Sequence, residues 1–113
     1  MKHYMKLNKK PFEMIANGQK TIELRLFDEK RALFNVGDEI EFTMSDNSNY
    51  HILVVITAIY RFDSFDELYK NLPKTSIGYL PEEKADPNDM IKYYSVEKQK
   101  KYGVVGIEIS LIS

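Results

Sequence analysis

The chain contains no cysteine and no long hydrophobic run, and each absence excludes classes of protein. Without cysteine there are no disulfide frameworks, no thiolate nucleophiles and none of the common structural zinc sites. The longest apolar run, residues 52–56, is far shorter than the roughly 20 residues that a membrane-spanning helix needs. The first residues run directly into charged side chains and offer no apolar core of a signal peptide. We therefore expect a soluble, cytoplasmic protein that does not bind membranes.

The familiar catalytic and cofactor motifs are also missing. There is no phosphate loop of the Gly-x-x-x-x-Gly-Lys-[Ser/Thr] type and no Gly-x-Ser-x-Gly nucleophile elbow. His3 and His51 are too far apart in sequence to indicate a metal-binding pair. We therefore predict no metal ion and no cofactor. Four neighbouring carboxylates are interpreted as helix caps and solvated side chains: Glu82, Glu83, Asp86 and Asp89.

The composition is that of an ordinary globular protein with an uneven distribution of charge. With 113 residues, 43% of them apolar, we predict one domain over residues 1–113. A net charge of −1 argues against a protein that coats nucleic acid in general. Residues 1–31 hold eight basic and four acidic side chains. Residues 32–91 hold four basic and eleven acidic side chains, and residues 92–113 hold four basic and two acidic ones. If the first and last strands pair in a closed barrel, the basic ends form one patch for a polyanion. Alternatively, these lysines only solubilise exposed faces.

The spacing of apolar residues predicts about five strands and three or four short helices. Pro11 suits the first turn of a helix, and Gly18 suits the left-handed residue that stops one. Ser64 and Glu67 form the pattern of a capping box. We therefore predict an α+β protein, a small mixed β-barrel with helices on its flanks, with a mobile loop at residues 74–85. The expected strands are residues 3–7, 21–26, 40–44, 50–62 and 105–111, and the expected helices begin near residues 11, 64, 86 and 95.

The most informative stretch is residues 18–25, where a helix ends and a strand begins. Lys20 lies at this joint and offers a point charge or, if desolvated, an amine of lowered pKa. Glu23 and Arg25 project from one face of the strand. The Arg25 guanidinium presents a rigid fork for phosphate or a base edge, and Glu23 is placed to orient it or to accept a proton. The alternative is a solvated strand face with an ordinary surface ion pair.

Gly18, Lys20, Glu23 and Arg25 match the G-x-K-x-x-E-x-R pattern of the ASCH domain family, which the chain resembles over nearly its whole length. The resemblance implies a PUA-like barrel with a polar cleft beside the first helix that binds RNA, a nucleotide or a nucleoside. By position, it places Lys20, Glu23 and Arg25 in that cleft, with Tyr94 and Ser95 as further candidates. The similarity continues through residues 36–42, 60–68, 93–95 and 102–107.

One branch of this family is an amidohydrolase that deacetylates acetylated cytidine with a lysine, a threonine and a glutamate. Lys20 occupies the lysine position, but the threonine position is Glu23 in this chain, and Thr21 points to a different slot. The glutamate of that branch has no single counterpart here, because three acids compete for it: Glu82, Glu83 and Asp86.

Three hypotheses of function therefore stand. The first is an RNA- or nucleotide-binding module whose ligand contacts Lys20, Glu23 and Arg25. The second is a small hydrolase that acts on a modified nucleoside or on RNA, with Lys20 as activated amine or proton carrier and Glu23 as base. The third is an accessory module that docks a protein partner, which also fits a net charge near zero.

Overall fold

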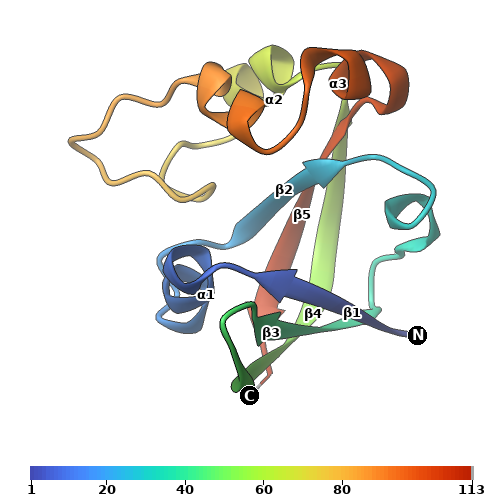
Figure 1. Cartoon of the computed structure of the whole chain (residues 1–113), viewed down its shortest axis with the longest axis vertical. Coiled ribbons are helices and arrows are strands. Elements are labelled where there is room, and N and C mark those ends of the chain that lie inside the picture. The colour runs from blue at the N-terminus through green and yellow to red at the C-terminus, as the bar shows by residue number, and fades with distance from the viewer. Residues whose placement is uncertain (113) are drawn as a thin grey trace.

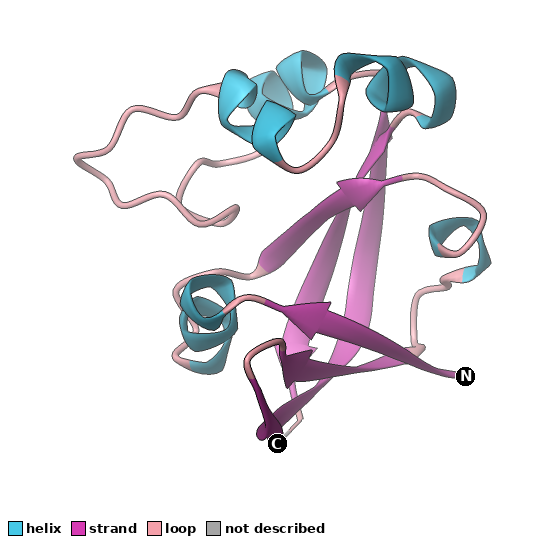
Figure 2. Ribbon diagram, in the orientation of Figure 1, coloured by secondary structure: helices cyan, strands magenta, loops and turns pink. Residues whose placement is uncertain are grey.

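The computed structural model describes residues 1–112 as an α+β fold around one strongly curled sheet (Figures 1 and 2). The predicted α+β class and the expected number of strands are confirmed. The described residues form five strands, β1 (Lys2–Leu7), β2 (Ile22–Leu26), β3 (Glu39–Met44), β4 (Asn47–Phe62) and β5 (Val104–Leu111). They also form the α-helices α1 (Lys9–Ala16), α2 (Phe65–Asn71) and α3 (Val96–Tyr102) and the 3-10 helices η1 (Arg31–Leu33) and η2 (Pro87–Lys92).

The local signals in the sequence account for the helix boundaries. The Ser64 hydroxyl accepts from the backbone N–H of Glu67 at 3.2 Å, as the capping-box pattern predicts, and α2 follows. Helix α1 begins two residues before the predicted start, at Lys9, so Pro11 is in its first turn but not at its first position. Proline is tolerated there because the N–H groups of the first turn have no partner within the helix.

The sheet has the strand order β1-β3-β4-β5-β2, so the two terminal strands do not pair. Strand β1 pairs in parallel with β3, from Lys2 beside Glu39 to Leu7 beside Met44. Strand β5 has antiparallel neighbours on both sides, β4 and β2, which leaves it no free edge for β1. The expectation that strand pairing joins the basic ends into one patch is therefore wrong, and the sheet is an open half-barrel with β1 and β2 at its edges.

The gap between the two edge strands is bridged by side chains, and we call it the β1–β2 seam. Arg25 of β2 donates from Nη2 to the backbone carbonyl of Lys6 at 3.0 Å. Lys30, just beyond β2, donates from Nζ to the carbonyl of Tyr4 at 2.9 Å. These two cations occupy carbonyls of β1 that point away from β3, so they take the place that a sixth strand would fill.

Strand β2 lies between two groups of buried apolar side chains, and each of its faces points towards one of them. Ile22, Leu24 and Leu26 pack with Phe65 and Leu68 of α2 in one group. The other group holds the inner faces of the remaining strands together with α1. Glu23 and Arg25 alternate with the apolar residues of β2 and therefore project from its opposite face. The second group is Met5, Leu7, Phe12, Ile15, Phe34, Ile40, Phe42, Met44, Ile52, Val54, Ile56, Val105, Ile107 and Ile109.

A buried carboxylate joins the beginnings of β1 and β3. His3 Nε2 lies 2.8 Å from Oδ2 of Asp38, the Asn35 N–H donates to the same oxygen at 3.0 Å, and the His3 ring lies against Phe34 with 4.0 Å between centroids. The hydrogen bond with His3, opposed by burial and reinforced by Asn35 and the N-terminal amine, lowers the pKa of Asp38 from 3.8 to about 2.

This shift predicts a distinct loss of stability in acid. Because the pKa of Asp38 is lower in the folded than in the unfolded chain, its ionised form stabilises the fold fully above about pH 4. That contribution is lost as the pH falls towards about 2. The melting temperature of the wild type should therefore fall more steeply through this window than that of Asp38→Asn, measured by circular dichroism. Parallel curves for the two proteins would contradict the assignment.

Candidate nucleotide-binding cleft

The turn after α1 places Lys20 two residues before the start of β2. Gly18 has φ +84°, a left-handed conformation that favours glycine, and its N–H donates to the Ile15 carbonyl at 3.1 Å. Two residues later the Lys20 N–H donates to the carbonyl of Met14 at 3.0 Å. The backbone of Lys20 is therefore held against the end of α1, which fixes the point from which its side chain extends.

Lys20, Glu23 and Arg25 form a connected and largely buried group, which we call the cleft triad. The Lys20 ammonium lies 2.8 Å from Oε1 of Glu23, and Arg25 Nε donates to Oε2 of the same carboxylate at 2.8 Å. The exposed fractions of the three side chains are 12%, 5% and 16% in chain order. The alternative of an ordinary solvated strand face is therefore wrong, because the surrounding elements cover this face of β2.

The electrostatics of the triad keep its carboxylate ionised. Burial by itself would raise the pKa of Glu23, but attraction to Lys20 and Arg25, together with their hydrogen bonds, lowers it below its ordinary value. Burial would likewise lower the pKa of Arg25, but the charge of Glu23 and the neighbouring Tyr94 raise it. One anion is thus shared by two cations, and the group carries a net positive charge that an anionic ligand can neutralise.

The triad forms part of the wall of a cleft with a volume of about 500 Å³. The cleft lies between α1 and the end of β1 on one side and η2 with the segment before it on the other. Its mouth carries three more lysines, Lys6, Lys10 and Lys92, and two carboxylates, Glu83 and Asp89. Its apolar and aromatic lining is Leu7, Pro11, Met14, Leu24, Tyr69, Ile77, Tyr79, Met90, Tyr93 and Tyr94.

The segment at residues 74–85, predicted to be a mobile loop, is anchored over Lys20. The Ser76 carbonyl accepts from the N–H groups of both Thr21 and Ile22, at 3.0 and 2.9 Å. The next residue, Ile77, is buried in the apolar group beside β2. A Cβ atom on Gly78 would lie 3.4 Å from Cδ of Lys20, so the backbone of this segment packs directly on the lysine side chain. It therefore closes one side of the cleft.

Two tyrosines that the sequence pattern does not single out complete the cleft. The hydroxyl of Tyr79 donates to Oδ2 of Asp89 at 2.6 Å and lies 3.1 Å from that of Tyr69. Burial and these contacts raise the pKa of Tyr79. This cluster ties the segment that covers Lys20 to α2 and η2. The only signal in the sequence is the total of eight tyrosines, and nothing in their spacing distinguishes these two.

The other residues proposed from the sequence fall in different places. Tyr94 lines the cleft and stacks on Phe65 of α2 with 6.2 Å between ring centroids. Ser95 instead caps α3, since its hydroxyl accepts from the Lys98 N–H at 3.2 Å, and it does not line the cleft. Among the three acids that compete for one position, only Glu83 lines the cleft. Glu82 is exposed, and the carboxylate of Asp86 caps η2.

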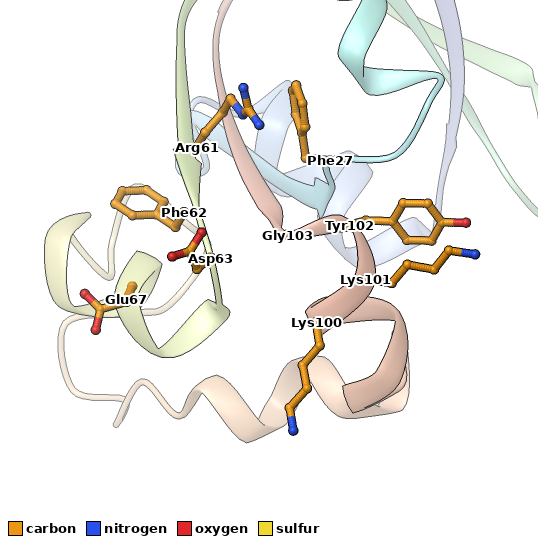
Figure 3. A pocket seen from close by; sticks show the side chains of 9 residues that line it. All are labelled: Phe27, Arg61, Phe62, Asp63, Glu67, Lys100, Lys101, Tyr102 and Gly103. Carbon is orange, nitrogen blue, oxygen red and sulfur yellow. The ribbon is translucent and has the colours of Figure 1, made fainter.

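A second, larger cavity of about 660 Å³ lies where β4 and β5 meet α2 and α3, and it holds none of the proposed site residues (Figure 3). Arg61 lies over the ring of Phe27 at 3.8 Å from its centroid. Lys100 and Lys101 point away from Arg61 and from one another in Figure 3. This cavity offers no desolvated charge comparable with that of the triad, because all of its charged side chains are exposed. These side chains are Arg61, Asp63, Glu67, Lys100 and Lys101.

Comparison with known proteins places this arrangement in a family. A family model for the ASCH domain matches residues 5–113. The chain belongs to the ASCH family. This confirms the resemblance drawn from the G-x-K-x-x-E-x-R pattern, and with it the PUA-like fold. ASCH domains are generally RNA-binding modules. No curated protein matches the chain.

Solved structures agree with this ASCH fold. The crystal structure of hypothetical protein PH0355 is 35% identical, with a TM-score of 0.85 and coverage of 99% of this chain and 100% of that one. The solution NMR structure of protein PF0455 from Pyrococcus furiosus is 32% identical, with a TM-score of 0.73 and coverage of 100% and 99%. A ZmASCH variant from Zymomonas mobilis, 15% identical with a TM-score of 0.67 over 95% of this chain and 66% of that one, shares the fold.

Two further observations concern metals and membranes. Within residues 1–112, no three side chains of His, Cys, Asp or Glu come together in a way that could hold a metal ion. None of the helices in this part of the chain is long and apolar enough to cross a membrane.

Proposed function

We propose that this ASCH domain binds RNA through a nucleotide held in the cleft beside α1. The observation that carries the proposal is the cleft triad, a buried carboxylate shared by two buried cations on the wall of a cleft of nucleotide size. A group that is desolvated and net positive favours an anionic ligand, because phosphate replaces the hydration that the cations lack.

Each member of the triad has a distinct role in this proposal. Lys20 uses one donor on Glu23 and keeps two for a phosphate or a carbonyl oxygen of a base. Arg25 is held by Glu23 and by the Lys6 carbonyl, so its remaining N–H groups are fixed in direction. Glu23 orients both cations and offers its oxygens to an amino group of a base. Tyr94 lies beside Arg25 and supplies an aromatic face.

The charge state of Glu23 favours binding over hydrolysis. A general base acting near neutral pH is most effective when its pKa is close to that pH. The two cations instead lower the pKa of Glu23, which makes it a weak base and a strong hydrogen-bond acceptor. The hydrolase hypothesis therefore needs a base other than Glu23, and the docking hypothesis gives no role to a buried ionic group.

Replacing Lys20 tests the proposal directly. Lys20→Met keeps most of the side-chain volume but removes a charged donor, so affinity for a short single-stranded RNA should fall at least about tenfold. The free energy of unfolding should change by less than the free energy of RNA binding, because Arg25 still neutralises Glu23. The measurement is a fluorescence-anisotropy titration of labelled RNA with wild type and variant, at two salt concentrations.

The chain provides a matched control in another lysine paired with a glutamate three residues away. Lys70 lies 3.7 Å from Glu67 on α2, but the two side chains are 73% and 54% exposed. Lys70→Met should therefore leave RNA affinity unchanged. Absence of RNA binding by the wild type at low salt would overturn the proposal. Release of acetate from acetylated cytidine, abolished in Lys20→Met, would instead establish the hydrolase hypothesis.

A further inference from the structure

The β1–β2 seam presents a row of cations next to the cleft. Arg25 and Lys30 donate to the carbonyls of Lys6 and Tyr4, which are two residues apart along β1. With a rise of about 3.3 Å per residue, the two carbonyls are about 7 Å apart along the strand, and each holds one cation, at 3.0 Å for Arg25 and 2.9 Å for Lys30. That spacing is on the order of one nucleotide step in an extended single strand, so the two positions suit consecutive phosphates.

Arg31 adds a third cation whose hydrogen bonding is incomplete. Its Nη1 lies 2.9 Å from Oδ2 of Asp28, which is the only carboxylate it pairs with among residues 1–112. Its Nε is buried and has no hydrogen-bond partner in that part of the chain. A buried donor without a partner is costly, and a movement of the Arg31 side chain towards an anion at the seam would supply the missing acceptor.

Positive charge exceeds negative charge along the seam. Burial lowers the pKa of Lys30, and repulsion from Arg31 and Arg25 lowers it further, while Asp28 alone opposes this. Within residues 1–112, Lys20, Arg25 and Arg31 form ion pairs with only two carboxylates, Glu23 and Asp28, and Lys30 adds a fourth cation beside them. The excess of cations attracts phosphate without needing any particular base.

The seam and the cleft are continuous. Arg25 belongs to both, since it donates to Glu23 in the cleft and to the Lys6 carbonyl on β1. Tyr94, which lines the cleft, lies within electrostatic reach of Arg25 and also of Arg31 and Asp28. The seam therefore offers a path for a chain that leaves the cleft beside Arg25.

We propose that Lys30 and Arg31 bind the phosphate of the nucleotide adjacent to the one in the cleft, so that the ligand is a single-stranded RNA chain and not a free nucleotide or nucleoside. This inference rests on the proposed function. It assigns the cleft to one nucleotide and the seam to the backbone that follows it. Backbone contacts of this kind add affinity and salt dependence but carry no sequence preference.

The experiment compares a six-nucleotide RNA with a mononucleotide on the same proteins. In Lys30→Gln/Arg31→Gln, affinity for the oligonucleotide should fall about tenfold at low salt. The slope of log affinity against log salt should become shallower by about 0.7 for each phosphate that the variant leaves without a cation. Affinity for the mononucleotide should stay within about twofold, because the cleft triad is intact. Lys100→Gln/Lys101→Gln, which removes two exposed lysines beside the second cavity, is the matched control.

The outcomes separate this inference from the proposed function. If the double variant keeps the oligonucleotide affinity and salt slope of the wild type, the proposed phosphate contacts at the β1–β2 seam are wrong. The proposal that the cleft binds a nucleotide would not be affected. An equal reduction of affinity for both ligands would also overturn it, because the substitutions would then act through the cleft. A wild type that binds neither ligand would overturn both proposals. If the double variant does not fold, Lys30→Gln alone, at an exposed position, provides the same test with a smaller change in slope, because Arg31 remains on the phosphate.

Discussion

Replacing Glu23 with glutamine is expected to lower the free energy of unfolding by about 3 kcal/mol, because two buried cations then lose their counter-charge. Lys20 and Arg25 each lie 2.8 Å from an oxygen of Glu23, and all three side chains are largely buried. A neutral amide matches the shape of the carboxylate but leaves two positive charges facing one another. Urea denaturation of wild type and Glu23→Gln measures the difference, and the same variant should no longer bind RNA.

The pH dependence of this difference distinguishes charge from shape. The pKa of Glu23 is lower in the folded than in the unfolded chain, where its ordinary value is 4.5. Its ionised form therefore contributes stability fully above about pH 4.5, and the contribution is lost as the pH falls through the lowered folded pKa. The gap between wild type and Glu23→Gln should accordingly be widest at neutral pH and narrow in acid.

Glu41 provides the control for an ion pair at the surface. It lies 3.0 Å from Lys2, and the exposed fractions of the two side chains are 28% and 38%. Glu41→Gln should cost less than about 1 kcal/mol, as solvated pairs do. If Glu23→Gln costs no more than Glu41→Gln, the triad is not an electrostatic unit and its proposed role in binding fails with it.

Arg25→Lys is expected to weaken RNA binding about 30-fold although the positive charge is kept. Arg25 donates in two directions, from Nε to Glu23 and from Nη2 to the Lys6 carbonyl, and a single ammonium cannot reproduce that fork. A well-placed bidentate arginine contact contributes about 2 kcal/mol to recognition, which corresponds to this change in affinity. Titration of the variant with the same labelled RNA measures the effect.

The equivalent substitution at Arg61 serves as its control. Arg61 lies over Phe27 beside the second cavity and does not line the cleft. Arg61→Lys should leave RNA affinity within about twofold of the wild type. Equal affinity of Arg25→Lys and wild type would show that charge alone, and not the geometry of the guanidinium, holds the ligand.

The parts of the cleft that can be predicted from sequence are those determined by neighbours along the chain. Gly18 is predicted to stop a helix, and its left-handed φ does so. Alternation predicts Glu23 and Arg25 on one strand face, and a hydrogen bond joins them across two residues. The same pattern places Lys20 at the joint between helix and strand, where the Met14 carbonyl holds its backbone. Each of these depends on backbone geometry over a few residues.

The parts that cannot be predicted depend on contacts between distant segments. The covering of Lys20 follows from Ser76 and Gly78, more than fifty residues away in the chain, packing onto Thr21 and Lys20. Within residues 1–112 the barrel that alternation of apolar residues suggests likewise stays open, because the two edge strands, β1 and β2, do not pair with one another. Backbone groups make most of these contacts, and they leave no signature in the side-chain sequence.

The β1–β2 seam also affects how the sheet behaves towards other proteins. An unpaired strand edge is a template onto which a strand of another chain can add, and such addition leads to aggregation. In β1 the outward carbonyls of Tyr4 and Lys6 are already occupied by Lys30 and Arg25. An incoming strand would have to displace both donors from these carbonyls. Its backbone is uncharged, so it could not offset the two positive charges that it approaches. The cations that give the domain its proposed affinity for RNA thereby also keep its open sheet from growing.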